Sequence, residues 1–534
     1  CTINRLDNTM TFSPLLNVAN FRRNQQLTGL SLLCVLSLTA CVSERAGPIA
    51  DPHQTTERQR HLLIVMDGLR PDYVTPELMP NLHALGERGV VFTDHHAVYP
   101  TVTRVNATSI STGAYPETHG LLGNSVYFPA VNESQFLNSG DRENLLSVER
   151  TEQHGLLTAP TLGEQLQNAG LSLLVVSAGS TGSSYLLNHT VAGGGIIHYE
   201  YTLPNDLMEE ILSINGRVPP ADTPNDARNR YVVDSFFQVG LPRIDPDVTI
   251  MWLSEPDASA HAHGIGHPIT HDSLAKQDDQ LREIQDRLDS MGWLEHLNIW
   301  VTSDHGFSTH TGGVQLDQLL APFNGTLEDG TPRIVAQSGA VYVRDGDPET
   351  ITQIVSLLQS SPEVGAIFTK GLDPSNPYQG SVAGTLSFDL ARWQHIRGSD
   401  ILFSGNWTAS ENEFGYPGTS AQNGVAGHGS SSPFDIHNTL IAAGPLLKSG
   451  LITNLPSGNV DFSPTFLSLL GVTIPDSMQG RVLNEAFLNG PEPEATKSTV
   501  HTVQSQDGLY QLKATVSDVG GHSYLDYTEV ERKE

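Results

Sequence analysis

The chain has 534 residues, of which 38% are hydrophobic and 16% charged, and it contains 49 glycines and 32 prolines. This composition is typical of a loop-rich globular protein and argues against general disorder. The 29 lysines and arginines are outnumbered by 59 acidic residues, giving a formal charge of -30. That charge argues against a nucleic-acid-binding surface, which would need Lys and Arg to neutralise phosphates. A small phosphorylated substrate stays compatible, since bound metal ions reverse the local potential.

Residues 1–41 have the pattern of a lipoprotein signal peptide. Arg22 and Arg23 form a positive segment, residues 27–38 form an apolar segment, and Leu38-Thr39-Ala40-Cys41 is a small-residue cleavage site. The site resembles a bacterial lipobox, so we expect a lipid on Cys41 after cleavage. Val42 follows rather than Asp, which by family custom permits sorting to the outer membrane, facing the periplasm of the cell envelope. A buried helix is the alternative, but the segment has no amphipathic period.

The cysteines and the polar stretch after Cys41 complete the organisation of this end. Cys1 and Cys34 leave with the signal peptide, so the mature chain has no cysteine pair and no disulfide. Residues 42–60 are polar with scattered Pro and Gly, which predicts a flexible tether. We expect residues 61–534 to form the catalytic domain.

Along residues 61–534, short apolar runs alternate with helical patterns. We predict strands at residues 61–66, 90–92, 171–176, 248–253, 297–301, 340–343 and 438–442, and helices at residues 80–88, 161–169, 272–291 and 465–470. The alternation favours an α/β fold with a doubly wound, mostly parallel sheet and helices on both faces. Gly-, Asn- and Pro-rich stretches near residues 190–230, 310–335 and 370–425 are predicted insertions that would form a cap.

Metal-binding residue types stand at the ends of several predicted strands. These residues are Asp67 after the first strand, Asp257 and His261 after residues 248–253, Asp304 and His305 after residues 297–301, and His428 ahead of residues 438–442; the hydroxyl residue Thr103 follows Asp67 in the chain. A parallel sheet gathers the carboxyl ends of its strands at one edge, so ligands distant in sequence can meet there. The pattern predicts a metal-assisted hydrolase.

The residue types suit two zinc ions, although other divalent metals are possible. Zinc takes about four ligands, and a catalytic site keeps one position open. The predicted sets are Asp67, Thr103, Asp304 and His305 for one ion, and Asp257, His261 and His428 for the other. Two such ions can clamp the attacking and leaving oxygens of a phosphoryl displacement. Singly each motif is weak, because an Asp after a strand is commonly a turn or helix cap.

The motifs occur in the order found in a known superfamily. They are Asp67-Gly68-Leu69-Arg70-Pro71-Asp72, Met79-Pro80-Asn81-Leu82, Tyr99-Pro100-Thr101-Val102-Thr103, Ser111-Thr112-Gly113, His119-Gly120 with Asn124, Glu255-Pro256-Asp257 with His261, Ser303-Asp304-His305-Gly306 and Gly427-His428-Gly429. Over about residues 61–485 the chain resembles the alkaline phosphatase superfamily, in its type I nucleotide pyrophosphatase/phosphodiesterase branch. The resemblance implies an alkaline phosphatase-like domain, two zinc ions, Thr103 as nucleophile and a phosphothreonine that water hydrolyses.

The residues around Thr103 agree with this resemblance. A threonine hydroxyl needs a metal or a base to become a good nucleophile, and the nearby acids would hold the metal. Residues 108–112 are predicted to be the helix after the nucleophile, whose N-terminal amides could contact a phosphoryl oxygen. Asn124 matches the position from which family members donate a side-chain amide to that oxygen, and its alternative role is a turn residue. Thr101 and Thr108 are rival hydroxyls.

Two features concern the choice between monoesters and diesters. Related threonine-dependent monoesterases carry a Lys and an Arg where this chain has residues 177–182, which contain neither. The missing pair favours diesters or pyrophosphate links. Arg104 departs from the branch's pattern of an apolar residue after the nucleophile, and it could pair with a substrate charge or with one of the many acids.

The sequence therefore predicts a two-zinc phosphodiesterase or nucleotide pyrophosphatase that acts on a small phosphorylated substrate such as a nucleotide. The alternatives are a phosphomonoesterase of the same superfamily and a surface metal-binding protein whose catalysis has lapsed. A sulfatase would need a Cys/Ser-x-Pro-x-Arg setting, which Thr103-Arg104-Val105 does not provide. No motif indicates the oligomeric state.

Overall fold

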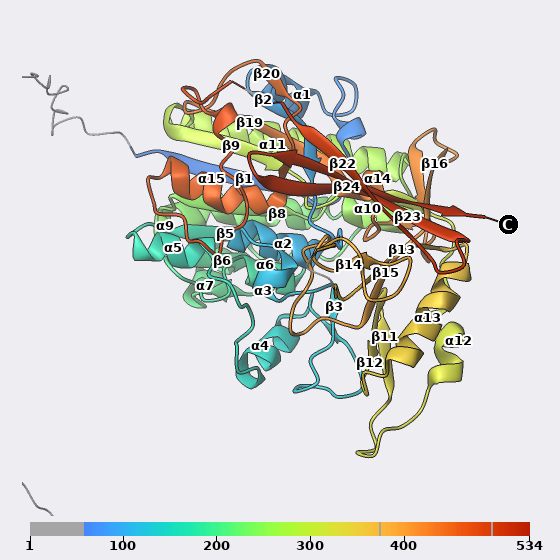
Figure 1. The fold of residues 1–534 in the computed structure, drawn as a ribbon. Helices are drawn as coiled ribbons and strands as arrows, with labels where there is room; N and C mark the ends of the chain where they lie inside the picture. The colour runs from blue at the N-terminus through green and yellow to red at the C-terminus, as the bar shows by residue number, and fades with distance from the viewer. Residues whose placement is uncertain (1–57, 373–374, 493–494, 534) are drawn as a thin grey trace, which may run out of the picture. The chain divides into compact units, whose positions relative to one another are not determined.

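The computed structural model describes residues 58–372, 375–492 and 495–533, which all belong to the unit from Glu57 to Glu534 (Figure 1). The predicted signal peptide with Cys41, and the predicted tether up to residue 57, lie outside the described residues. The first strand begins at Arg60, the last residue that we assigned to the tether. Among the described residues, no helix has the length and apolar character needed to cross a membrane.

A ten-stranded, mostly parallel sheet forms the centre of this unit, in the order β20-β2-β19-β9-β1-β8-β5-β6-β7, with β21 beside β2. Its strands are β1 (Arg60–Met66), β2 (Val90–His96), β5 (Leu173–Ser177), β6 (Gly194–His198), β7 (Thr202–Leu203), β8 (Val248–Leu253), β9 (Leu297–Thr302), β19 (His437–Ala443), β20 (Leu451–Thr453) and β21 (Ser457–Gly458). The predicted α/β class is confirmed.

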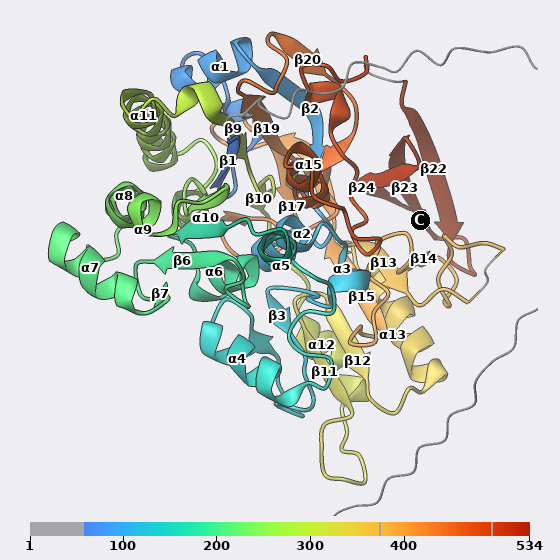
Figure 2. The same ribbon diagram turned by 90° about the vertical axis from the view of Figure 1, so that its left-hand side faces the viewer.

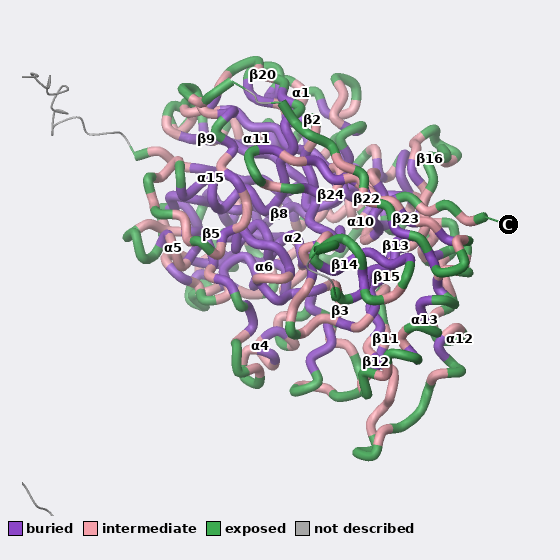
Figure 3. The backbone as a smooth tube through the Cα atoms, in the orientation of Figure 1, coloured by how far each residue is buried: buried purple, intermediate pink, exposed green. Residues whose placement is uncertain are grey.

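Helices cover both faces of the sheet, which explains why its strands are continuous apolar runs rather than alternating ones. In β1, Leu62, Ile64 and Met66 pack with one set of helices, and Leu63 and Val65 with the other. The first set is α1 (Pro80–Glu87), α7 (Asp206–Asn215), α8 (Asp226–Ser235) and α11 (Pro268–Ser290) (Figure 2). The second set is α2 (Thr103–Thr112), α4 (Arg142–Thr151), α5 (Leu162–Asn168), α6 (Thr181–Leu187) and α15 (Phe462–Leu469). Figure 3 shows β5 and β8 buried between these layers.

One central strand runs against the others and still contributes to the same edge. β19 pairs antiparallel with both β9 and β2, whereas β1 pairs parallel with β8 and β9. The amino end of β19 therefore lies at the edge where the parallel strands have their carboxyl ends. This orientation explains why His428 precedes its strand while the other predicted ligands follow theirs.

Smaller sheets and short elements complete the described fold. A five-stranded sheet contains β11 (Ile334–Gln337), β12 (Ala340–Val343), β13 (Val364–Thr369), β14 (Leu386–Ser387) and β15 (Ile401–Gly405), with α13 (Pro348–Ser360) against it. A four-stranded sheet contains β10 (Ser308–His310), β16 (Trp407–Glu411), β17 (Pro417–Ser420) and β18 (Ala426–Gly427), and a C-terminal sheet contains β22 (Lys497–Gln504), β23 (Tyr510–Val519) and β24 (His522–Arg532). The short elements are α3 (Pro116–His119), α9 (Leu241–Ile244), α10 (Asp257–His263), α12 (Leu316–Leu320), α14 (Pro433–Ile436), β3 (Ser125–Val126) and β4 (Leu137–Asn138).

Three expectations differ from the structure. Residues 190–230, predicted as an insertion over the sheet, contain β6 and β7, which extend the central sheet itself, and also α7. Only Ile196 and Ile197 are apolar in the glycine-rich β6, so the strand pattern was too short to recognise. The helix predicted at residues 108–112 begins at Thr103 instead. The helix predicted from residue 272 begins at Pro268, where the His267 side chain caps it by accepting from the Ile269 amide.

Candidate active site

Three aspartates at the ends of three neighbouring strands lie together in the interior. Asp67 follows β1, Asp304 follows β9 by two residues, and Asp257 begins α10 after β8. Each has one buried carboxylate oxygen without a hydrogen-bond partner in the described chain: Oδ1 of Asp67, Oδ1 of Asp257 and Oδ2 of Asp304. Buried carboxylates are costly unless a cation or a donor compensates them. The unpaired oxygens therefore fit a site that binds metal ions.

Three histidines point their Nε2 atoms at these carboxylates. Each is held through Nδ1 by a backbone carbonyl: His261 by Ala426 at 2.9 Å, His305 by Gly306 at 3.0 Å and His428 by Thr101 at 2.8 Å. A carbonyl only accepts, so Nδ1 carries a proton and Nε2 is the nitrogen that faces the carboxylates. This is the orientation that metal-bound histidines adopt.

The two predicted ligand sets are brought together, with His305 between them. The ligand atoms of Asp67, Asp304 and His305 lie within 4.8 Å of one another, and so do those of Asp257, His305 and His428. His261 Nε2 lies 3.3 Å from Asp257 Oδ1, because α10 places these two residues one helical turn apart as expected.

The electrostatics of the site also favour a bound cation. Burial raises the pKa of Asp67 well above its usual range, and the charges of Asp304 and Asp257 raise it further. Burial and the neighbouring His305 lower the pKa of His428, which keeps its imidazole neutral. A neutral imidazole beside crowded carboxylates is the ligand form that a metal ion requires.

Thr103 is the hydroxyl that faces this cluster. It is the first residue of α2, and its Oγ1 lies 3.3 Å from His305 Nε2. The rival Thr101 donates its hydroxyl to the Ser430 carbonyl at 2.8 Å, and the rival Thr108 donates to the Arg104 carbonyl at 2.8 Å within α2. Both rivals therefore have structural hydrogen bonds, which leaves Thr103 as the candidate nucleophile.

Asn124 lies beside the nucleophile in the loop before β3. Its Oδ1 accepts a hydrogen bond of 3.0 Å from the backbone N–H of Arg104. This bond orients the amide, and Nδ2 donates to no residue that the structure describes. Asn124 Nδ2 can therefore donate to a phosphoryl oxygen, as the predicted role requires. The same bond occupies the Arg104 amide, which lies at the N-terminal end of α2 because this helix begins at Thr103 and not at residue 108 as predicted.

The Arg104 side chain lies next to the stretch in which we found no Lys or Arg. Its guanidinium packs against Gly140, where a Cβ would collide with it, and Gly140 accepts a 2.9 Å hydrogen bond from the Gly182 amide. Its Nε is buried without a hydrogen-bond partner, and the guanidinium forms no ion pair with any acid in the described ranges. Burial lowers the pKa of Arg104, and the charges of the three aspartates oppose that shift.

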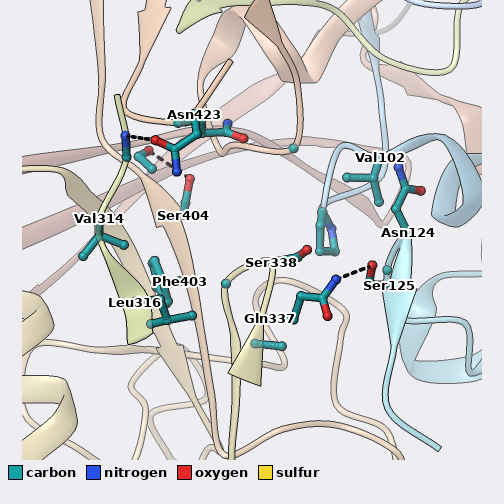
Figure 4. Close-up of a pocket in the computed structure, with 18 of the residues that line it drawn as sticks. Val102, Asn124, Ser125, Val314, Leu316, Gln337, Ser338, Phe403, Ser404 and Asn423 are labelled. Atoms are coloured by element: carbon teal, nitrogen blue, oxygen red, sulfur yellow. Dashed lines mark hydrogen bonds between the residues drawn. The ribbon is translucent and has the colours of Figure 1, made fainter. Parts of the chain in front are cut away.

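A cavity of about 550 Å³ borders the site at Asn124, His261 and His428. His261, His428 and Asn124 line its floor, and its walls come from the small sheets, with Leu316, Leu402 and Phe403 among the apolar residues. Figure 4 shows Val102 and Asn124 on one side and Val314, Leu316 and Phe403 on the other, with Gln337 donating to Ser125 at 3.0 Å between them. The cavity has the size and mixed polarity of a small-molecule site.

Comparison with known families agrees with this geometry. Residues 61–392, more than half of the chain, match the model of the family described as type I phosphodiesterase / nucleotide pyrophosphatase. The chain belongs to this family. Like other proteins with its fold, this phosphodiesterase-family member places its candidate ligands at the carboxyl edge of the sheet.

Individual relatives support the same assignment. Human bis(5'-adenosyl)-triphosphatase ENPP4 is 28% identical over 281 residues, which are 51% of this chain and 53% of the relative, so the chain spans about half the length of the curated relatives it matches first. Among solved structures, a murine ENPP5 variant described as inactive and in complex with AMP has a TM-score of 0.54 at 17% identity and covers 78% of this chain and 96% of its own. A variant of alkaline phosphatase PafA has a TM-score of 0.59 at 17% identity and covers 80% and 99%. These two structures confirm the alkaline phosphatase-like fold.

The structure also adds site residues that the sequence did not reveal in this family member. Trp252 in β8 donates its Nε1 to Asp67 Oδ2 at 2.9 Å, and Ser303 accepts from the Leu69 amide at 2.8 Å. Asn459 donates its Nδ2 to the Asp304 carbonyl at 2.8 Å. Trp252 belongs to an apolar run, so its sequence context indicates only a core residue.

Proposed function

We propose that this chain is a two-zinc hydrolase of phosphodiester or pyrophosphate bonds and that it acts through a phosphothreonine on Thr103. The observation that carries the proposal is the position of the Thr103 hydroxyl, 3.3 Å from His305 Nε2 and beside three buried carboxylates with unpaired oxygens. A cation bound among the three carboxylates would compensate their charge, and it would also activate the hydroxyl.

The donor set fits zinc, with Asp67, Asp304, His305 and Thr103 as ligands of one ion and Asp257, His261 and His428 as ligands of the other. When bound, the two ions supply Lewis acidity and neutralise charge on the phosphoryl oxygens. Thr103 Oγ1 loses its proton and attacks phosphorus, while the bond from phosphorus to the leaving oxygen breaks and that oxygen takes up a proton. The phosphothreonine so formed keeps the other ester group of the substrate. Water then attacks this phosphorus, the bond to Oγ1 breaks, the water oxygen stays on phosphorus, and one of the water protons restores the Thr103 hydroxyl.

In this proposal, Asn124 and Arg104 bind the phosphoryl group and the negative charge of the substrate. The Arg104 amide holds Asn124 through Oδ1, so Asn124 Nδ2 is preset to donate to a phosphoryl oxygen as charge develops there. The Arg104 guanidinium has no acid partner in the described chain, so we assign it to the negative charge of the substrate. Residues 177–182 lack the Lys and Arg that related monoesterases carry there. This absence removes an expected partner for monoesters but not for diesters or pyrophosphates.

Two comparisons support a nucleotide substrate. The relative ENPP4 is named as a bis(5'-adenosyl)-triphosphatase, and a similar solved structure holds AMP. The cavity of about 550 Å³ next to Asn124 suits a nucleotide-sized group.

The test is hydrolysis of a chromogenic diester and of dinucleoside triphosphates by zinc-loaded protein. We expect Thr103→Ala and Asp304→Asn to lose nearly all activity, because one lacks the nucleophile and the other a ligand. Mass spectrometry of acid-quenched wild type should detect Thr103 carrying the phosphoryl group together with the ester substituent that the first step leaves on phosphorus. Thr108→Ala, which removes a rival hydroxyl from the same helix, should stay active. Full activity of Thr103→Ala would contradict the proposal.

We also propose that the mature protein is held by a lipid on Cys41 at the bacterial outer membrane, facing the periplasm. The support is the lipobox-like sequence Leu38-Thr39-Ala40-Cys41 with Val42 after it. Membrane fractionation of cells that express the chain tests this, and Cys41→Ser should move the protein from the membrane to the soluble fraction. An unchanged distribution would contradict the anchor.

A further inference from the structure

A second group of metal-binding residue types lies outside the active site and shares no residue with it. Asp94 and His96 are near the end of β2, His437 begins β19, and Asp526 is in β24 of the C-terminal sheet. The ligand atoms of these four residues lie within 4.8 Å of one another. We call these four residues the hairpin cluster, because Asp526 belongs to the β23–β24 hairpin whereas the other three belong to the central sheet.

Irregularities in two strand pairs place these side chains together. His96 stands opposite His437 in the β2–β19 pair, whose register then shifts so that Thr93 and Asp94 face Thr439 alone. In the β23–β24 pair, Thr515 faces Tyr527 and Val516 faces Leu525, which makes Asp526 the extra residue of a bulge. Bulges typically redirect side chains at functional sites.

His96 has the same arrangement as the three histidines of the active site. Its Nδ1 donates to the Ser457 carbonyl at 2.8 Å, and its Nε2 faces Asp526 Oδ1 at 2.9 Å and Asp94 Oδ1 at 3.7 Å. The other oxygen of Asp526 accepts from the Ser517 hydroxyl at 2.8 Å. Both side chains are therefore oriented by outer partners, as metal ligands usually are.

An ion pair between His96 and Asp526 explains only half of the cluster. His437 Nδ1 lies 3.4 Å from Asp94 Oδ1, and apart from this contact neither side chain makes a hydrogen bond to a residue that the structure describes. Both are 28% exposed, whereas His96 is 3% and Asp526 10% exposed. The cluster is thus anchored on its inner side and open to solvent on the other, which leaves an entry path for a cation.

We propose that Asp94, His96, His437 and Asp526 bind one divalent cation that fastens the C-terminal hairpin to the central sheet. Two imidazole nitrogens and two carboxylate oxygens match a tetrahedral zinc site with four protein ligands. Zinc sites in which the protein supplies all four ligands stabilise folds rather than catalyse reactions. This ion is additional to the two of the proposed active site, so the proposal stands independently of the hydrolytic reaction.

Zinc content per chain is the decisive measurement. After dialysis against buffered zinc, wild type should hold one zinc more than His437→Gln, and both should hydrolyse the diester at similar rates. His437→Gln keeps the His96–Asp526 ion pair. If the cluster were only this ion pair, the variant would therefore hold as much zinc per chain as the wild type. His83→Gln is the matched control, since His83 also lies near a carboxylate, 3.9 Å from Glu87, but belongs to no such group. Equal zinc in wild type and His437→Gln would overturn the proposal.

Asp94→Asn provides a second variant at the exposed side, in case His437→Gln fails to fold. It too should lose one zinc, and cobalt(II) added to the wild type should give more tetrahedral-type absorption than in this variant. Loss of diester hydrolysis with unchanged zinc content in Asp94→Asn would count against the hairpin site. A hydrolytically inactive wild type that still holds the extra zinc would count only against the proposed function.

Discussion

Asp67 shows how a single side chain can be fixed through one oxygen and left free at the other. Its Oδ2 accepts from Trp252 Nε1 at 2.9 Å, while its Oδ1 has no partner among the described residues. An outer donor of this kind orients a metal ligand without occupying it. The buried Trp252 therefore supports the candidate metal site although it lies in a core strand.

We therefore expect Trp252→Phe to weaken zinc binding by about 10- to 100-fold, because Asp67 loses its orienting donor. Competition with a chelator measures this affinity. Trp300→Phe is the matched control, since Trp300 is equally buried but its Nε1 has no hydrogen-bond partner in the described structure. An equal loss of affinity in both variants would show that core packing, not the hydrogen bond, is responsible.

The proposed function assigns Arg104 to the negative charge of the substrate. Because its guanidinium is unpaired beside the nucleophile, Arg104→Met should lower kcat/KM for a dinucleoside triphosphate by about 100-fold, the value of a strong charge-assisted hydrogen bond. A diester with a single negative charge should lose about tenfold or less. Arg104→Lys should restore part of the difference. Equal losses on both substrates would assign Arg104 a structural role.

At the level of residues, the grouping of the candidate metal ligands could be predicted because strand topology gathers them at one edge. Asp67, Asp257 and Asp304 each follow an apolar run, and the parallel pairing of those strands places the three residues side by side. Partners that depend on long-range packing could not be predicted: Trp252 contacts a residue 185 positions away, and nothing in its neighbourhood distinguishes it from a core residue.

Among the helices, α1 is capped by another helix rather than by its own sequence. Its N-cap residue Met79 offers no side-chain acceptor. Asp278 of α11 accepts instead, through Oδ1 from the Leu82 amide at 2.8 Å and through Oδ2 from the Asn81 amide at 3.0 Å. The cap satisfies amides that a helix N-terminus leaves unpaired, and it joins two helices on the same face of the sheet.

Asp278→Ala should lower the free energy of unfolding by about 2 kcal/mol, since it removes a cap and leaves buried amides without an acceptor. Urea denaturation measures the change. The neighbouring Asp279→Ala is the control, because Asp279 is 65% exposed and has only a 3.7 Å contact with Arg282, so its effect should stay within about 0.5 kcal/mol. A similar loss in the two variants would contradict the capping role.

Elements with a clear apolar period could be predicted, and polar or very short ones could not. The strand at Ala340–Val343 has the predicted bounds, and α1 ends one residue before its predicted end. The first turn of α2 has no apolar period that would mark it in the sequence, and the helix as a whole packs against α6 and α15. The two-residue β7 exists only through its pairing with β6.

Stability of the whole molecule should depend on pH through a residue at the base of the central strand. His61 begins the buried part of β1, stacks on Phe466 with ring centroids 5.4 Å apart, and has no hydrogen-bond partner for its ring nitrogens in the described chain. Burial lowers the pKa of His61 to about 3, only weakly opposed by the charge of Asp247. The folded state therefore binds this proton more weakly than the unfolded chain, whose histidine has a pKa of about 6.5.

As pH falls below about 6.5, the unfolded state gains a proton that the folded state excludes, so stability decreases by up to about 1.4 kcal/mol per pH unit until the folded pKa is reached. His61→Leu removes this term. Between pH 6.5 and 5 the wild type should lose about 2 kcal/mol more than the variant in urea denaturation. Metal release at acid pH affects both proteins alike. Parallel pH profiles would show that His61 is not the origin of the dependence.

The antiparallel β19 has a consequence for how this protein can change its substrate. β9 ends at Thr302 and β19 begins at His437, both at the same edge of the sheet. The chain between them leaves and re-enters the central sheet at the active site, and it supplies most of the cavity wall. Insertions and deletions in this single continuous segment can therefore reshape substrate recognition during evolution while the sheet keeps every hydrogen bond.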